Sequence, residues 1–170
     1  MDLRPWKIRL KDQEFNSWIQ RSNCYSLFFD GASKSNPGIA GAGGLILNDK
    51  GECILGYEWS LGKVSNNRAE ALALFQGLNQ LGILGVKKVR VFGDSSIVIR
   101  LMVHHQNSPN TMLQQVNLHN RLLHQNMDDI QYFHVLRSLN KEADERANNA
   151  CGRPAGTLRC NSSEIFQAIP

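Results

Sequence analysis

Four acidic residues stand where the sequence pattern changes from one expected element to the next, namely Asp30, Glu70, Asp94 and Asp144. Asp94 follows an apolar, β-branched run and a glycine, and it precedes two serines and a helical pattern. We therefore expect it at the outer end of a buried strand. Carboxylates gathered at one point of a small fold repel each other unless cations bind there. The chemistry that these residue types indicate is a shared site for divalent metal ions.

Each acid also has an ordinary structural explanation. Asp30 is followed by a glycine and can be a turn residue, and Glu70 can be a surface glutamate favoured by a helix dipole. Asp94 can be an N-cap, and Asp144 can be a first-turn acid. These ordinary roles do not require the four acids to lie close together, whereas a shared metal site does. If the strands that carry Asp30 and Asp94 are parallel neighbours, both acids lie at one edge of the sheet, where nearby helices can supply the other two.

The hydrophobic pattern predicts the elements that would position these acids. Three strands joined by short loops come first, and helices then alternate with strands. The strands are expected at 25–30, 40–48, 53–60, 89–92 and 130–135. The helices are expected from Ser65 or Asn66 to about 81, and at 94–103, 111–125 and 140–150. The order βββαβααβα predicts an α/β fold with a mixed five-stranded sheet, in which the later strands are parallel and helices flank the sheet.

Length and composition indicate one domain in a protein of 170 residues. We expect a tail or linker at 1–22, the domain at 23–152 and an irregular tail at 153–170. No apolar run approaches the length of a transmembrane helix, and no secretory signal is visible, so we expect no membrane partner. The four cysteines are widely spaced, which argues against a zinc site or a disulfide framework and favours an intracellular location, cytoplasmic or nuclear.

The chain is mildly basic, with a net charge of +4 and a pI near 9.0. This charge is compatible with a polyanionic partner. Part of the surplus lies in the first 24 residues, which are either a solvated tail or a nucleic-acid-binding arm. We expect a monomer.

Four blocks of the sequence resemble the ribonuclease H family and occur in the family's order. The blocks are Asp30-Gly-Ala-Ser-Lys-Ser-Asn36-Pro-Gly38, Asn66-Asn-Arg-Ala-Glu70, Gly93-Asp94-Ser95 and Asn140-Lys-Glu-Ala-Asp144. The resemblance covers about residues 25–150 and is greatest to members from plants and retroelements such as retrotransposons. It implies a ribonuclease H-like fold.

The resemblance also implies an activity: endonucleolytic hydrolysis of the RNA strand of an RNA/DNA hybrid, which leaves 5′-phosphate and 3′-hydroxyl ends. The implied cofactors are two Mg²⁺ ions, with Mn²⁺ as a substitute. Asp30 would bridge both ions, Glu70 and Asp94 would hold the first, and Asp144 would hold the second. Carboxylate oxygens suit such hard ions, and two ions about 4 Å apart suit an in-line displacement.

Several polar residues match family positions that contact the hybrid. Amide side chains both donate and accept hydrogen bonds, so they suit 2′-hydroxyls and minor-groove base edges. The alternative is that the asparagines only form caps and turns. The positions matched to substrate contacts are Ser33, Asn36, Asn66 and Asn67, together with Lys63 and Ser65 for a phosphate of the DNA strand.

The sequence departs from many family members in two places. The loop before the last acid lacks their histidine. His134 is expected on a strand, so Arg137 is the candidate cation for product release. A basic protrusion is also missing, because only Arg100 and Arg121 are fully positive between Asp94 and residue 128. Fewer phosphate contacts predict weaker binding, unless the basic tail or a tethered partner such as a reverse transcriptase supplies the grip.

Two other functions stay open at this point. The chain could be a catalytically weak module, derived from a retroelement, that binds or tethers a hybrid. It could also be an exonuclease with a similar acidic site, although the order of the blocks disfavours this.

Overall fold

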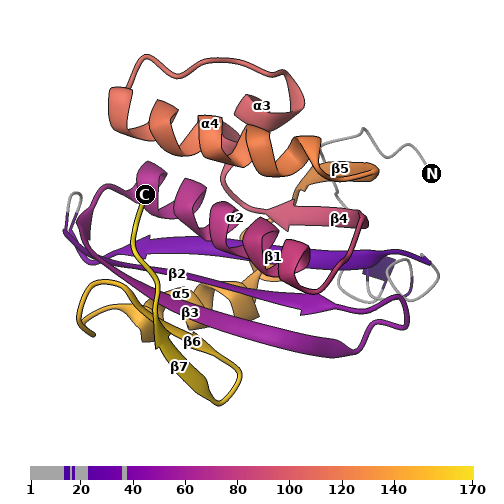
Figure 1. Ribbon diagram of the computed structural model, residues 1–170, viewed down its shortest axis with the longest axis horizontal. Coiled ribbons are helices and arrows are strands. Elements are labelled where there is room, and N and C mark those ends of the chain that lie inside the picture. Colours follow the sequence, from indigo (N-terminus) through magenta and orange to yellow (C-terminus); the bar gives the residue numbers. More distant parts are fainter. Residues whose placement is uncertain (1–13, 16, 18–22, 36–37) are drawn as a thin grey trace.

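The computed structural model describes residues 14–15, 17, 23–35 and 38–170. Figure 1 shows one mixed β-sheet with helices on both of its faces. The strands are β1 (Tyr25–Ser33), β2 (Gly38–Leu47), β3 (Cys53–Val64), β4 (Lys88–Gly93), β5 (Asp129–His134), β6 (Thr157–Cys160) and β7 (Ser163–Phe166). The helices are α2 (Asn66–Ile83), α3 (Ser96–Val103), α4 (Thr111–Gln125) and α5 (Lys141–Ala150), and a 3₁₀ turn, η1 (Arg137–Leu139), precedes α5.

The strands run in the order β5-β4-β1-β2-β3-β6-β7. β1, β2 and β3 are antiparallel, whereas β4 is parallel to both β1 and β5. This arrangement confirms the expected α/β fold with a mixed sheet whose later strands are parallel. β1 lies between a parallel and an antiparallel neighbour, and its apolar run Leu27-Phe28-Phe29 is buried, as expected of a central strand.

The expected number of strands was wrong, because the sheet has seven strands rather than five. The additional strands β6 and β7 lie in the segment that was predicted to be irregular (Figure 1). β6 pairs with β3, and its Leu158 lies opposite Trp59 with both side chains fully buried. Each of the two strands has only four residues, which is too short for an apolar alternation to stand out in the sequence.

Helix α5 packs against β2 on the face of the sheet opposite to α2 (Figure 1). Its alanines at 143, 147 and 150 are fully buried. The approach depends on glycine, because a Cβ atom at Gly43 would lie 2.3 Å from the backbone nitrogen of Ala147. Small residues on both surfaces therefore let this helix, which carries Asp144, lie close to the sheet.

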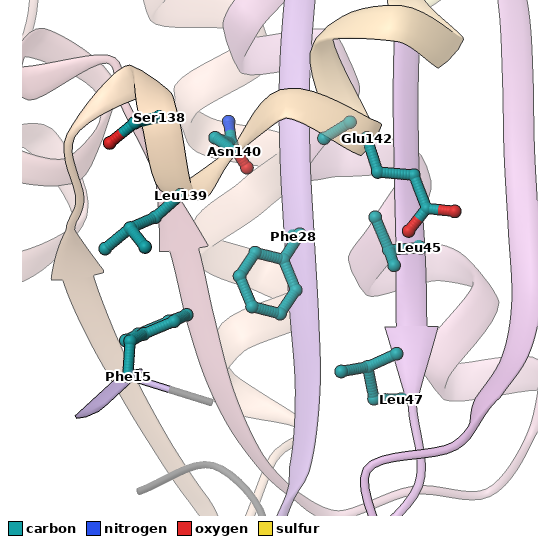
Figure 2. A pocket seen from close by; sticks show the side chains of 9 residues that line it. Phe15, Phe28, Leu45, Leu47, Ser138, Leu139, Asn140 and Glu142 are labelled. Atoms are coloured by element: carbon teal, nitrogen blue, oxygen red, sulfur yellow. The ribbon is translucent and has the colours of Figure 1, made fainter. Parts of the chain in front are cut away.

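Next to α5, on the same face of the sheet, lies a second apolar cluster, in which Phe28, Phe92 and Phe133 stack. Phe15 closes this cluster, with 2% of its surface exposed and its ring edge-on to Phe28 and Phe92 at 5.9 and 5.3 Å. Figure 2 shows Phe15 beside Phe28 at a pocket on this face. Phe15 is thus not part of a free tail. The rest of the predicted tail at 1–22 falls largely outside the described residues.

Among the helices that the structure describes, none is both long enough and apolar enough to cross a membrane.

Candidate active site

Three of the four predicted acids come together at one edge of the sheet. Carboxylate oxygens of Asp30, Glu70 and Asp94 all lie within 4.8 Å of one another. The parallel pairing of β1 with β4 explains two of them, because the register ends at Phe29 opposite Gly93, and the acids are the next residues on each strand. This is the convergence at the carboxyl ends of parallel strands that was expected from the sequence.

Glu70 joins them because α2 begins directly against β1. A Cβ atom at Gly31 would lie 2.4 Å from the backbone carbon of Ala69 and 2.4 Å from the nitrogen of Glu70. Only glycine permits this approach. The helix starts after Ser65, whose hydroxyl accepts a hydrogen bond from the backbone nitrogen of Arg68 at 3.3 Å. Glu70 therefore lies one turn into the helix, beside Asp30.

Asp94 does not serve as a helix cap. Helix α3 begins at Ser96, and the capping residue is Ser95, whose hydroxyl accepts from the nitrogen of Val98 at 3.4 Å. The helix expected from residue 94 thus starts two residues later, and the carboxylate of Asp94 belongs to the acidic cluster instead. A ring nitrogen of His134, at the end of β5 as expected, lies 3.1 Å from the carbonyl oxygen of Asp94.

Asp144 reaches the site from α5. Its carboxyl group lies close enough to raise the pKa of Asp30, although it lies outside the tight group of three. Asn148, one turn further along α5, donates from its amide to the carbonyl oxygen and to the carboxylate of Asp144, at 2.9 and 3.3 Å. Lys34 in turn donates to Asn148 at 3.0 Å. The carboxylate of Asp144 is therefore held by Asn148, which is in turn contacted by Lys34, the residue after β1.

A cavity of about 390 Å³ opens beside the acids. Both Glu70 and Asp144 line it. The other predicted site residues in its wall are Ser33, Asn66, Asn67 and Arg137. Lys63 and Ser65 are not among the lining residues, and Asn36 lies outside the described part of the chain.

Sequence reasoning missed two polar residues of the cavity wall, Ser95 and Asn148. Asn148 follows Asp144 at a spacing of four, so the shared face of a helix could have revealed it. Ser95 stands beside Asp94 in a matched block, but the pattern of residue types allowed Asp94, as an alternative to its metal-binding role, at the capping position that Ser95 holds.

Burial disfavours the ionised form of two acids in the cluster. Burial, with additions from Asp94 and Asp144, raises the pKa of Asp30 from 3.8 to about 8. Burial and the neighbouring Asp30 likewise raise the pKa of Glu70 well above its usual range. One carboxylate oxygen of Glu70 is buried without any hydrogen-bond partner among the described residues. Because hard oxygen ligands of this kind are uncompensated in the protein itself, the site fits a divalent cation.

Comparison with known proteins agrees with this geometry. Residues 28–150 match the model of a family described as reverse transcriptase-like. The chain is 31% identical over 123 residues to ribonuclease HI of Halobacterium salinarum, a match that covers 72% of this chain and 62% of that protein. The chain belongs to the ribonuclease H family. It spans less than two thirds of the length of this ribonuclease H relative.

Further ribonuclease H relatives extend the comparison. An Arabidopsis thaliana protein with a provisional ribonuclease H name is 29% identical over 121 residues, which cover 71% of this chain and 19% of that protein. The crystal structure of the H. salinarum ribonuclease H1 superposes with a TM-score of 0.70 at 28% identity, covering 74% of this chain and 96% of that one. LC11-RNase H1, from a compost metagenome and solved with an RNA/DNA hybrid, gives 0.69 at 26% identity, with 75% and 96% covered.

Proposed function

We propose that this protein is a divalent-metal-dependent endoribonuclease that hydrolyses the RNA strand of RNA/DNA hybrids and leaves 5′-phosphate and 3′-hydroxyl ends. The observation that carries the proposal is the convergence of Asp30, Glu70 and Asp94 within 4.8 Å beside a cavity that Asp144 also lines. The similarity to LC11-RNase H1, which was solved with an RNA/DNA hybrid, supports the choice of substrate.

The four acids would serve as ligands of two cations. Asp30, Glu70 and Asp94 would hold one, and Asp144 with Asp30 would hold the other. Mg²⁺ is the proposed ion and Mn²⁺ its substitute, because all the ligands are hard carboxylate oxygens. Such ions, when bound, supply positive charge to the in-line displacement at a phosphodiester. The protein's part is to hold the acids at a fixed separation, in a buried setting where they bind the cations strongly.

The cavity wall supplies the groups that would recognise the substrate. Asn66 and Asn67 at the start of α2, with Ser33 at the end of β1, can donate to and accept from the 2′-hydroxyl of RNA. A DNA strand lacks this hydroxyl, so these contacts would select RNA. Arg137 stands in the same wall and would attract the phosphate of the cleaved strand, as proposed for product release.

The test is a cleavage assay with labelled RNA/DNA hybrid, double-stranded RNA and double-stranded DNA in Mg²⁺. We expect cleavage of the hybrid, including a circular or end-blocked hybrid, which only an endonuclease can cut. Asp94→Asn keeps the shape of the side chain but removes a charged metal ligand, so activity should fall by more than about 100-fold. Wild-type activity in this variant, with unchanged thermal unfolding, would exclude the acidic site as the centre of cleavage.

A second candidate is a hybrid-binding module with little catalysis. It is favoured by the scarcity of basic residues, since only Arg100 and Arg121 carry full positive charge between Asp94 and residue 128. A gel-shift assay run beside the cleavage assay separates the two functions. Stable binding of the hybrid without cleavage in either Mg²⁺ or Mn²⁺ would indicate the module.

A further inference from the structure

The fourth acid reaches the site by a different route from the other three. Asp30 and Asp94 directly follow the last paired residues of β1 and β4, and Glu70 lies in the first turns of α2, which packs on β1. Asp144 comes from α5, which covers the opposite face of the sheet and follows a 3₁₀ turn (Figure 1). The separation between Asp144 and Asp30 therefore depends on what fixes the start of α5 relative to β1.

Asn140 makes that connection. Its side chain is 1% exposed, and its amide nitrogen donates to the carbonyl oxygen of Phe29 at 3.0 Å, one residue before Asp30. Its own carbonyl oxygen accepts from the backbone nitrogen of Asp144 at 3.0 Å. A single residue thus joins the backbone beside Asp30 to the first turn of α5.

The arrangement is costly for stability. The amide oxygen of Asn140 is buried and has no hydrogen-bond partner within the described structure, and the side chain does not cap α5. An unpaired buried acceptor destabilises a fold. The surroundings are largely apolar, and Figure 2 shows Asn140 near Phe28 and Leu139 in the lining of the pocket on this face. A leucine of similar size would suit such surroundings and would remove the unpaired amide oxygen, but it would leave the carbonyl oxygen of Phe29 without this donor.

We propose that Asn140 is a positioning residue that sets the separation of Asp144 from Asp30, an inference that rests on the proposed two-metal function. Its amide holds β1 against the start of α5, so that both carboxylates reach the cation that they would share. Mg²⁺ is sensitive to such placement because it requires near-ideal octahedral geometry at short distances. The residue acts through the two acids and does not itself touch a cation or the substrate.

The experiment compares Asn140→Leu with the wild-type chain in three measurements. Calorimetry reports Mg²⁺ binding without substrate, a Mg²⁺ titration of hybrid cleavage reports the functional requirement, and thermal unfolding in EDTA reports stability. Removal of a hydrogen bond that orients metal ligands costs about 10–100-fold in metal affinity, so we expect a weakening and a raised Mg²⁺ requirement of that size. Tm in EDTA shows that the variant is folded, and KM for the hybrid at saturating Mg²⁺ should be unchanged.

The matched control is Asn117→Leu. Asn117 is also buried, at 2% exposure, and its amide donates to the carbonyl oxygen of Gln106 at 3.0 Å, but it lies on α4, outside the acidic site. Its replacement should leave Mg²⁺ affinity unchanged, whatever it does to Tm. Asn140→Ala serves as a second variant, because it also removes the donor without adding a charge, and it should show the same decrease in Mg²⁺ affinity if Asn140→Leu does not fold.

Two results would overturn the inference: Mg²⁺ affinity in folded Asn140 variants equal to wild type, or an equal decrease in Asn117→Leu. A wild-type protein that binds Mg²⁺ but cleaves no hybrid would instead refute the proposed function, while the calorimetric comparison would still decide the role of Asn140.

Discussion

Asp30 and Glu70 are carboxyl groups that the folded protein holds where a charge is poorly solvated. The pKa of Asp30 is raised to about 8 from an ordinary 3.8, first by burial and then by its acidic neighbours. In the unfolded chain the same group loses its proton near pH 4. Between these values the folded state binds more protons than the unfolded state, so the free energy of unfolding falls as pH rises. Below about pH 4 both states are protonated, and this destabilisation is absent.

We therefore predict that, in EDTA, raising the pH from 5 to 8 lowers Tm more in the wild type than in Asp30→Asn. Mg²⁺ should restore Tm, and the rise in Tm that it causes should be larger at pH 8 than at pH 5, because cations compete with protons for the cluster. Differential scanning calorimetry at both pH values checks this. A wild-type Tm with the same pH dependence as that of Asp30→Asn would contradict the linkage.

Strand ends and helix starts are visible in the sequence, and together with the family resemblance they were sufficient to predict that Asp30, Glu70 and Asp94 meet. They were not sufficient to predict how each acid is held. The capping role of Ser95 and the amide contact of Asn140 with Phe29 are choices among hydrogen-bond partners. Such choices depend on atomic positions in the folded protein, which a pattern of residue types does not encode.

At the level of elements, the site depends on how closely α2 meets β1. Gly31→Ala would place a Cβ atom 2.4 Å from the backbone at Ala69 and Glu70, so the helix must shift. We predict a decrease of about 1–3 kcal/mol in the free energy of unfolding, as for other overpacked positions, together with weaker Mg²⁺ binding. Urea denaturation and calorimetry measure the two effects.

Gly82→Ala is the control for that change, because it lies on the same helix and a Cβ atom there would have nothing within 4 Å. Alanine should be neutral or stabilise the protein by up to about 1 kcal/mol. Equal behaviour of the two variants would show that the close approach of α2 is not required.

The C-terminal strands form part of the same sheet. Leu158 is fully buried opposite Trp59. Leu158→Ala should therefore cost about 2–5 kcal/mol, as other core truncations do. Ile165→Ala on the outer strand, where the side chain is 56% exposed, should change stability by less than about 0.5 kcal/mol. Unfolding monitored by tryptophan fluorescence measures the stability of the two variants. A small effect of Leu158→Ala would show that the C-terminal strands are dispensable for the stability of the domain.

The elements that carry the acids were predictable because they are long and strongly patterned, as in β1 and α2. The two last strands were not, since four residues of mixed polarity do not show alternation, and their pairing with β3 is a long-range contact. Phe15 illustrates the same limit. Its neighbours in sequence are polar, and only the cluster of Phe28 and Phe92 explains its burial.

Over the whole molecule, the distribution of charge should decide how the hybrid is held. Removing residues 1–13 deletes Arg4, Lys7, Arg9 and Lys11 while keeping Phe15 in its cluster. If this segment binds phosphates, the slope of log K against log salt should become shallower by about 0.9 for each phosphate that the shortened chain no longer neutralises. Binding of the hybrid in EDTA at several salt concentrations measures the slope. An unchanged slope would show that residues 1–13 make no phosphate contacts, so that the domain itself or a tethered partner must bind the hybrid.

The buried acids have a consequence for the protein's evolution. Where carboxylates are crowded together for catalysis, substitutions that abolish catalysis commonly stabilise the fold. A copy released from selection for cleavage would gain stability by losing Asp30 or Glu70. Inactive descendants of this chain would therefore persist as well-folded domains available for other uses, rather than being removed by misfolding.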